Sequence, residues 1–323
     1  MSRTRAVFAI AAFLAARAAL AQDFPSKPVV ILVPAAAGGP TDTLTRVLAQ
    51  AMSEPLRQQV LIENMGGAGG TIGINKVAKA RPDGYSLLLY HIGMATSPAL
   101  YRKLPYDTLN DFDYIGQVAD VPMTLVAKKA TPAANFAEFL AYAKANKDKV
   151  TYANAGVGSA SFLCGLLFMS AVQTDFTMVP YKGTGPAMND LVGGQVDFMC
   201  DQTTNTVPQS RSGNIKVYGV TTKTRLASLP DVPTLHEQGL RDFDLVVWNG
   251  LYAPKGLPKP VQDRLVAALQ SAVQAPAFRT RLADLGAEPV PTTKATPQSL
   301  GTMLKAEVEK WTPIIRKAGV YAD

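Results

Sequence analysis

The sequence has 323 residues, a formal net charge of +7 and a hydrophobic fraction of 47%. A chain of this length exceeds what one hydrophobic core usually organises, so we expect two domains. The lysines and arginines are scattered, which excludes the basic stripe of a nucleic-acid-binding protein, and no segment beyond the N-terminus is apolar for the roughly eighteen residues that a membrane span needs.

Residues 1–21 have the pattern of a secretory signal peptide. Two arginines form a basic start, the apolar run 6–16 is too short to span a membrane, and Ala19–Ala21 matches a cleavage site. An uncleaved anchor is the alternative, because Arg17 follows the apolar run. We expect the signal peptide to be removed and the mature chain, residues 22–323, to be periplasmic.

The first structural unit alternates strands and helices. The run VVILV at 29–33 predicts a strand buried on both faces, and apolar residues at three- and four-residue spacing predict a helix over 42–56. Strands at 60–63 and 85–90 flank a further helix at 71–80. This β-α-β-α-β order predicts a parallel sheet covered by helices.

A second unit of the same kind is expected after Pro122. Its predicted strands are 123–129, 150–155, 176–181, 195–200 and 216–222, and its predicted helices are 135–145, one ending near 171, and one near 187–192. The remainder is predicted as a proline-rich loop with a short helix (229–240), a strand (244–254) and helices at 259–275, 276–286 and 297–317. We therefore expect two α/β lobes, with residues 22–121 and 244–323 forming lobe one and residues 122–243 forming lobe two.

Patterns typical of catalysis are missing from the sequence. The chain has two histidines far apart, no Cys-x-x-Cys, no Gly-x-Ser-x-Gly and no Walker A motif. The loop GGAGGTIG at 66–73 fits a dinucleotide fingerprint poorly, because Ile72 occupies the position of its third glycine. We expect no enzymatic activity, no cofactor and no metal.

Cys164 and Cys200 are the two cysteines of the chain. In an oxidising compartment they either form a disulfide or remain two buried thiols. We favour the disulfide, because both cysteines are expected near one sheet of the same lobe.

One arrangement recurs along the chain: a strand, a run of small residues and a helix start. It is found at 34–42 (PAAAGGPTD) and 154–161 (NAGVGSAS), with a related turn at 181–186 (YKGTGP). Helix N-termini carry unpaired N–H groups and partial positive charge, and small residues let a ligand approach them. Because ligands of open α/β sheets bind at the carboxyl ends of strands, these loops predict an anion site.

Several long motifs follow one another along the chain. They are DFPSKPVVILVPAAAGGPTDTLTRVLAQAMSE, VLIENMGGAGGTIGINKVAKARPDGYSLLL, LYRKLPYDTLNDF, TYANAGVGSAS, VPYKGTGPAMNDLVGGQVD, LPDVPTLHEQGL and KWTPIIRKAG. In this order they resemble the receptors of tripartite tricarboxylate transporters (the Bug family), and the resemblance covers residues 23 to about 319.

The resemblance implies a type II periplasmic binding-protein fold, an α/β architecture whose two lobes close on a small ligand, usually a carboxylate. It implies that the loops 34–42 and 154–161 face each other across the cleft, the first loop acting through ordered waters. The candidate ligand-binding residues are Ala36, Gly38, Gly39, Thr41, Asp42, His91, Gly93, Asn154, Gly158, Ser159, Ala160, Ser161, Tyr181, Lys182, Gly183, Asp201 and Gln202.

The sequence departs from the family at two places in the expected cleft. Three alanines, 35–37, replace bulkier residues of the first loop, and Phe162 stands where the family usually has histidine. Both changes hint at an aromatic or otherwise apolar carboxylate. Asp201 would repel an anion, so it either receives an ammonium or hydroxyl group of the ligand or caps a helix.

These observations predict a periplasmic substrate-binding protein, monomeric, that captures a small carboxylate for the membrane permease subunits of a tripartite transporter. The carboxylate could be a di- or tricarboxylate, an amino acid or an aromatic acid. One alternative is a ligand-sensing receptor for a membrane sensor kinase, whose binding chemistry would be identical. A less favoured alternative is an exported α/β enzyme.

Overall fold

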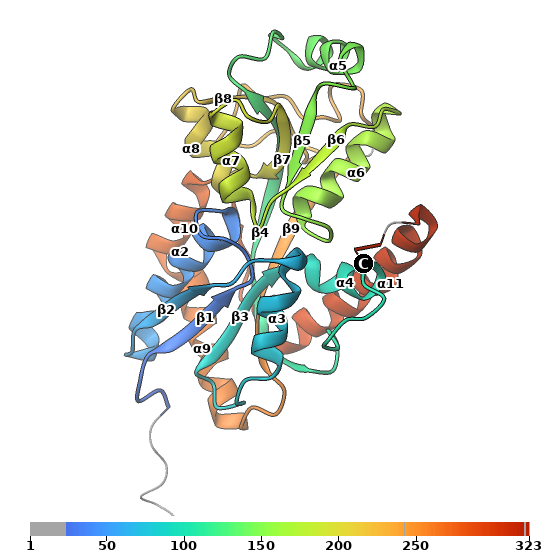
Figure 1. Cartoon of the computed structure of the whole chain (residues 1–323). Coiled ribbons are helices and arrows are strands. Elements are labelled where there is room, and N and C mark those ends of the chain that lie inside the picture. The colour runs from blue at the N-terminus through green and yellow to red at the C-terminus, as the bar shows by residue number, and fades with distance from the viewer. Residues whose placement is uncertain (1–23, 242, 320, 323) are drawn as a thin grey trace, which may run out of the picture.

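The computed structural model describes residues 24–241, 243–319 and 321–322. The expected signal peptide lies outside the described residues. Figure 1 shows the described chain as two halves stacked along long central strands, with helices on both sides of each half. Below, the first half is the part built on β1, β2, β3 and β9, and the second half is the part built on β5 to β8; β4 runs through both.

A single mixed sheet passes through the whole molecule in the order β2-β1-β3-β9-β4-β7-β5-β6, while β8 and β10 pair with β4 beside that path. Its strands are β1 (Val29–Val33), β2 (Val60–Asn64), β3 (Ser86–His91), β4 (Phe112–Lys128), β5 (Thr151–Asn154), β6 (Thr177–Pro180), β7 (Phe198–Gln202), β8 (Ile215–Val220), β9 (Val246–Pro254) and β10 (Glu288–Pro289).

The predicted parallel pairing is confirmed for the outer strands of each half and is wrong at the centre. β1 pairs in parallel with β2 and β3, and β5 pairs in parallel with β6 and β7. β9 is antiparallel to β3 and β4, and β4 is antiparallel to β7 and β8. A central strand that is buried on both faces is apolar throughout, whether it is parallel or antiparallel to its neighbours. Its hydrophobic pattern therefore does not indicate its direction in the sheet.

β4 is a single strand that begins at Phe112, whereas the sequence predicted a strand that begins at 123. Residues 112–122 pair with β9, and residues 123–127 pair with β7. Pro122 therefore lies inside β4, opposite Val246 at the start of β9. The residue bounds of the two lobes stay a prediction.

The helices are α2 (Pro40–Leu56), η1 (Ala68–Gly70), α3 (Thr71–Ala78), α4 (Gly93–Leu100), α5 (Phe136–Ala145), α6 (Ala160–Val172), α7 (Thr184–Val192), α8 (Thr203–Arg211), α9 (Lys259–Gln274), α10 (Pro276–Asp284) and α11 (Pro297–Ala318). In the first half, α2, α9 and α10 lie on one side of the sheet, and α3, α4 and α11 lie on the other (Figure 1). The apolar stripe of α2, including Leu44 and Leu48, packs into one core with Leu265 and Leu269 of α9.

Two α-helices and the short η1 were not predicted, and one predicted helix is wrong. α4 and α8 were missed, whereas the segment 229–240 forms turns and an isolated bridge in place of a short helix. α4 contains Pro98, and α8 contains Pro208 and three threonines, so neither has a helical propensity that stands out from the sequence.

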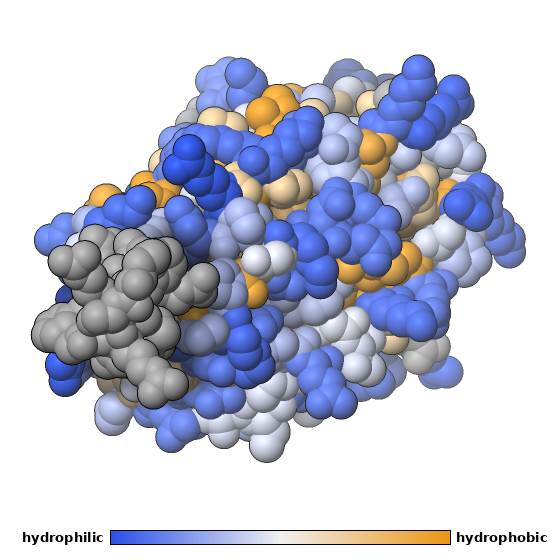
Figure 2. Space-filling view, turned by 90° about the horizontal axis from the view of Figure 1, so that it is seen from below, coloured by the Kyte–Doolittle hydropathy of each residue, from blue (hydrophilic) through white to orange (hydrophobic). Residues whose placement is uncertain are grey.

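The face of the molecule in Figure 2 is mostly hydrophilic, with small separate hydrophobic patches. The exposed large apolar side chains are Leu61, Ile72, Val192, Ile314 and Tyr321. Within the described ranges, no helix combines the length and the hydropathy needed to cross a bilayer.

Candidate functional site

A small pocket lies between the two halves, at the ends of six strands. It is lined by Pro34, Ala35, Gly39, Pro40, Thr41, Gly69, Gly70, Tyr90, His91, Ala155, Ser159, Ala160, Ser161, Lys182, Gly183, Thr184, Asp201 and Gln202. These residues end or follow β1, β2, β3, β5, β6 and β7, or begin the helices after them, so the pocket is at the location expected for ligands of an α/β sheet.

Four helices begin at the pocket. The residues that precede them as N-caps, Gly39 of α2, Ser159 of α6, Gly183 of α7 and Gln202 of α8, all line it. Of these N-caps, only Ser159 uses its side chain to accept a hydrogen bond from its own helix. The first N–H groups of a helix lack intrahelical acceptors, so this pocket concentrates free donors and positive helix ends.

The small residues of two loops let the halves touch through their backbones. The Ala36 N–H donates a hydrogen bond to the Lys182 carbonyl oxygen over 3.1 Å. A Cβ atom on Gly185 would lie only 2.7 Å from the Ala37 carbonyl oxygen, and one on Gly183 would lie 2.9 Å from the Ala36 nitrogen. The halves are therefore closed on each other, and small residues are required at this contact.

The loop between β5 and α6 is held by its own polar groups. The Asn154 Oδ1 accepts a hydrogen bond from the Gly156 N–H, and the Ser161 hydroxyl accepts one from the Ala155 N–H. Gly156 and Gly158 have φ angles of +90° and +87°, which favour glycine. Hydroxyl and amide groups here fix the loop, so the helix N–H groups can remain available.

Asp42 is turned away from the pocket. Its carboxylate accepts hydrogen bonds from the Gly38 N–H and from Arg46. Burial opposes ionisation of Asp42, but the bonds from Arg46 and Gly38 outweigh burial and lower the pKa of the carboxyl group. Asp42 thus shapes the first turn of α2.

His91 ends β3 and is a neutral group of the pocket. Burial lowers its pKa to about 3. The Gly93 N–H donates to its Nδ1 atom over 3.1 Å, and its ring stacks on the ring of Tyr90. Tyr90 in turn donates from its hydroxyl to the Gly69 carbonyl oxygen, which ties the loop before α3 to β3.

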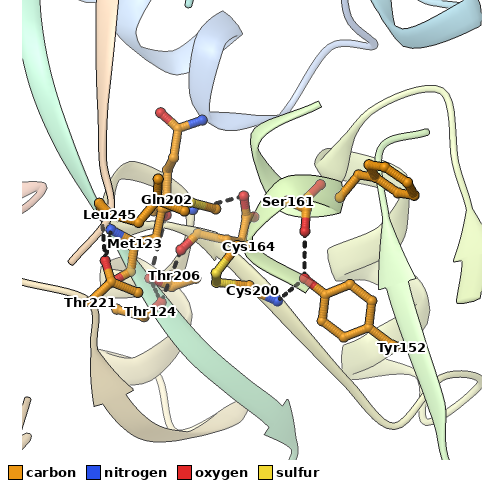
Figure 3. Close-up of a disulfide and its surroundings, with 12 residues drawn as sticks. Met123, Thr124, Tyr152, Ser161, Cys164, Cys200, Gln202, Thr206, Thr221 and Leu245 are labelled. Carbon is orange, nitrogen blue, oxygen red and sulfur yellow. Dashed lines mark hydrogen bonds between the residues drawn. A yellow bond between two sulfur atoms is a disulfide. The ribbon is translucent and has the colours of Figure 1, made fainter. Parts of the chain in front are cut away.

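Asp201 and Gln202 end β7, directly after a disulfide between Cys164 and Cys200 (Figure 3). Asp201 is 1% exposed, and its carboxylate accepts hydrogen bonds from the Gln202 N–H over 2.8 Å and from the Asn205 side chain over 2.5 Å. Burial raises the pKa of Asp201 to about 6, although these hydrogen bonds oppose the rise.

The hydroxyl of Tyr152, a residue of β5, links α6 to β7. It donates to the Ser161 carbonyl oxygen over 2.5 Å and accepts from the Cys200 N–H over 3.2 Å (Figure 3). Since Ser161 begins α6 and Cys200 precedes Asp201, the disulfide and Tyr152 together hold two segments of the pocket in register.

The structure brings a large part of the predicted site together. The predicted residues that line the pocket are Gly39, Thr41, His91, Ser159, Ala160, Ser161, Lys182, Gly183, Asp201 and Gln202. The predicted residues outside its lining are Ala36, Gly38, Asp42, Gly93, Asn154, Gly158 and Tyr181. The latter act within or between loops; the Tyr181 hydroxyl, for example, donates to Asp190.

Other lining residues were not among the named candidates, although five of them lie in the loops and the turn predicted at the cleft. Those five are Pro34, Ala35, Pro40, Ala155 and Thr184, and the others are Gly69, Gly70 and Tyr90. Gly69 and Gly70 belong to the glycine-rich loop at 66–73, which the sequence analysis considered only for dinucleotides. This loop is rich in glycine and follows a strand, as the loop 34–42 does, and that likeness could have identified it as part of the site.

The two predicted determinants of specificity contribute only Ala35 to the lining of the pocket. Phe162 is buried and does not line the pocket, so it adds no apolar surface there. Of the three alanines, Ala35 alone lines the pocket, whereas Ala36 and Ala37 contact the loop before α7.

The pocket offers no arrangement for a metal ion or a buried counter-charge. In the described part of the chain, no group of three or more His, Cys, Asp or Glu side chains could hold a metal. Lys182 lines the pocket but is exposed. Backbone N–H groups and neutral side chains are therefore the buried groups available to an anion, and Lys182 is the exposed cation of the lining.

A sequence model of the tripartite tricarboxylate transporter family receptors matches residues 44–320. A protein encoded in the TAR-I ttuE-ttuC' intergenic region of Agrobacterium vitis is 52% identical over 93% of this chain and 87% of its own length.

Two solved structures are similar over nearly their whole length. The periplasmic binding protein BugD is 49% identical, with a TM-score of 0.90 over 92% of this chain and 99% of BugD. MatC from Rhodopseudomonas palustris with bound malate is 40% identical, with a TM-score of 0.86 over 90% of this chain and all of MatC (100%). The fold is that of the two-lobed periplasmic binding proteins, and the chain belongs to the family of tripartite tricarboxylate transporter receptors.

Proposed function

We propose that this protein captures a small carboxylate in the pocket between its halves and presents it to the membrane permease subunits of a tripartite transporter. The observation that carries the proposal is the convergence of α2, α6, α7 and α8, whose N-caps all line one pocket. Backbone N–H groups at helix ends stabilise an anion without a side-chain cation.

The similarity to MatC supports the choice of a carboxylate. MatC holds malate, a dicarboxylate, in a structure that matches this chain at 40% identity. A phosphate or sulfate would satisfy the same helix ends, so the relative's ligand is the reason for placing a carboxylate first.

We infer that the pocket binds without chemical conversion. Among the described residues of the pocket, the hydroxyls of Ser159 and Ser161 hydrogen bond to each other; Ser159 also accepts the Phe162 N–H of α6, and Ser161 also accepts the Ala155 N–H of the preceding loop. The Nδ1 atom of His91 accepts the Gly93 N–H and is not available as a base. No hydroxyl–imidazole pair of the kind that activates a nucleophile is formed there.

We further propose that the mature receptor begins near Gln22, is monomeric and is periplasmic. The family supports the compartment, since BugD is a periplasmic binding protein. Mass spectrometry of the protein recovered from the periplasm should show a chain without residues 1–21.

A thermal-shift panel tests carboxylate capture. The panel contains succinate, malate, citrate, glutamate, benzoate, nicotinate and butyrate, with phosphate, glucose and putrescine as controls. An acid at about 100 times its Kd should stabilise the folded protein by about 2.7 kcal/mol, which raises Tm by several degrees. Stabilisation by glucose or putrescine alone would contradict the proposal, and stabilisation by phosphate alone would assign the pocket to a different anion.

A further inference from the structure

Three side chains of the pocket carry polar groups without a protein partner. Thr41, His91 and Gln202 are 3%, 5% and 3% exposed. No hydrogen bond from another described residue reaches the Thr41 hydroxyl, the Nε2 atom of His91 or the Gln202 side-chain amide. None of these three groups is among the fully buried, unpaired polar atoms of the described residues, so each reaches the open space of the pocket, where it can hydrogen bond to a bound molecule.

The hydrogen-bond network fixes the chemical form of His91. Because the Gly93 N–H donates to Nδ1, that nitrogen is an acceptor and carries no proton. A neutral imidazole then carries its proton on Nε2, and burial keeps the ring neutral. His91 is consequently a hydrogen-bond donor toward the pocket without being a cation.

Gln202 presents a neutral group from the opposite half. Figure 3 shows its side chain extending away from the disulfide, with no hydrogen bond to the residues drawn around it. The backbone of Gln202 is held firmly, because its N–H donates to Asp201 and its carbonyl precedes α8. The amide offers both a donor and an acceptor at a fixed place.

We infer that His91 and Gln202 are specificity-determining residues that hydrogen bond the captured acid as neutral groups, His91 donating through Nε2–H and Gln202 binding through its amide. This inference rests on the proposed function, because it concerns the same pocket. His91 belongs to β3 of the first half and Gln202 to β7 of the second half, so one acid that reaches both groups links the halves.

The arrangement selects a short acid with polar groups at both ends. A monocarboxylate with an apolar tail would leave one of the two buried groups unpaired, and sites built to form hydrogen bonds strongly reject analogues that lack the partner. The aromatic acids suggested by the sequence departures are therefore disfavoured, in agreement with the position of Phe162 outside the pocket.

Histidine NMR tests the state of His91 directly, because the chain has only two histidines. The exposed His236 lies outside the pocket, so His236→Gln leaves a single imidazole without altering the site. In this variant, ¹H–¹⁵N spectra should show the neutral Nε2–H form from about pH 5 to about pH 8, since the pKa is far below the usual 6.5 or so. The Nε2 proton should shift when the panel acid with the largest effect on Tm is added.

Titration of that imidazole near its ordinary pKa, or an Nε2 proton that stays unchanged at saturating acid, would overturn the role of His91. If no panel acid binds, the proposed function itself fails. If an acid binds the wild type but His91 and Gln202 do not respond, only the present inference fails.

Affinity measurements separate recognition from a structural role. His91→Phe removes the donor, whereas His91→Gln keeps a neutral donor, so Phe should weaken binding about 10- to 100-fold and Gln should retain most of the affinity. Gln202→Leu should reduce the preference for succinate over butyrate, two four-carbon acids that differ in the second carboxylate. Equal losses for both acids, or losses below about twofold in folded variants, would contradict the inference.

Discussion

Asp201 is a buried carboxylate within a pocket that we propose to hold carboxylates. Its oxygens accept the Gln202 N–H and the Asn205 side chain, both at the start of α8. Gln202 is the N-cap of α8, so Asp201 does not cap the helix itself; its bonds to Gln202 and Asn205 favour a structural role just before α8 over a contact with a ligand ammonium. Its charge nonetheless remains beside the pocket, and its raised pKa makes that charge sensitive to pH.

Asp201→Asn should change how stability depends on pH. The pKa of Asp201 is about 6 in the folded state and about 4 in the unfolded state, so the folded state holds an extra proton between these values. The stability of the wild type relative to the variant should therefore fall as pH rises from about 4 to about 6, by roughly 2–3 kcal/mol, and then stay level. Urea unfolding of both proteins across this range measures the difference.

The same titration should act on ligand capture. Protonation of Asp201 removes a negative charge from the pocket, so the wild type should bind a panel acid more tightly at about pH 5.5 than at about pH 8. Asp201→Asn is the control that lacks this contribution; because the protonation of the acid itself affects both proteins equally, the difference between their two pH dependences isolates the charge of Asp201. An unchanged pH dependence in the variant would show that the charge of Asp201 is not felt by the ligand.

Residue types near the site were predictable, but the direction of their side chains was not. A serine at a helix start can bind a ligand or its own loop, and Ser161 accepts the Ala155 N–H of its own loop. Tyr181 is adjacent to a lining residue, yet its hydroxyl binds Asp190. These outcomes depend on contacts made after folding, which residue identity and spacing do not contain.

At the scale of elements, the periodic segments were predicted well and the irregular ones were not. The strand predicted at 29–33 has the bounds of β1, and the helix predicted at 42–56 begins two residues earlier because Pro40 is well suited to a first helical position. β4 was cut at Pro122, since proline usually ends a strand, but here the strand changes partners at that point. α8 directly follows β7, and Thr204 and Thr206 are buried in it. This packing outweighs the weak helical propensity of its sequence.

The disulfide joins two elements of the pocket, so its removal should affect both stability and binding. Cys164 and Cys200 are 36 residues apart, and loop closure of this length is worth about 4 kcal/mol in the chain-entropy model. Replacing both by serine should lower the urea midpoint. It should also weaken acid binding at temperatures far below Tm, because Cys164 lies in the first turns of α6 and Cys200 precedes Asp201.

Reductant supplies the matched control for this prediction. The wild type treated with reductant should resemble the double serine variant, and the variant itself should not respond to reductant. Equal urea midpoints for the oxidised wild type and the variant would contradict a stabilising role of the bridge.

At the scale of the whole molecule, the contact between the halves depends on a glycine. Gly185 of α7 packs against the backbone of the first loop, where a Cβ atom would come within 2.7 Å of the Ala37 carbonyl oxygen. Gly185→Ala should hold the halves apart and weaken acid binding at least roughly tenfold, a loss of about 1.4 kcal/mol. In the presence of saturating acid, small-angle X-ray scattering should show a larger radius of gyration for Gly185→Ala than for the wild type.

Gly193→Ala is the matched control. Gly193 ends the same helix, and the atoms nearest to an added Cβ belong to α7 itself, the closest being the Asn189 carbonyl oxygen at 3.3 Å. Alanine raises helical propensity at either position, so weaker helix formation cannot explain a loss seen only in Gly185→Ala. If Gly185→Ala has the same radius of gyration and the same affinity for the acid as the wild type, the contact is not needed for capture.

The order of strands also determines when the first half can form. β3 lies between β1, which precedes it closely in the chain, and β9, whose residues lie roughly 160 positions later. While the chain emerges from the ribosome, β3 therefore has an unpaired edge until almost the whole sequence has been made, and such long-range pairing slows folding. If the chain is exported unfolded, as the proposed signal peptide implies, this delay favours export, because the first half cannot complete its sheet without the C-terminal segment.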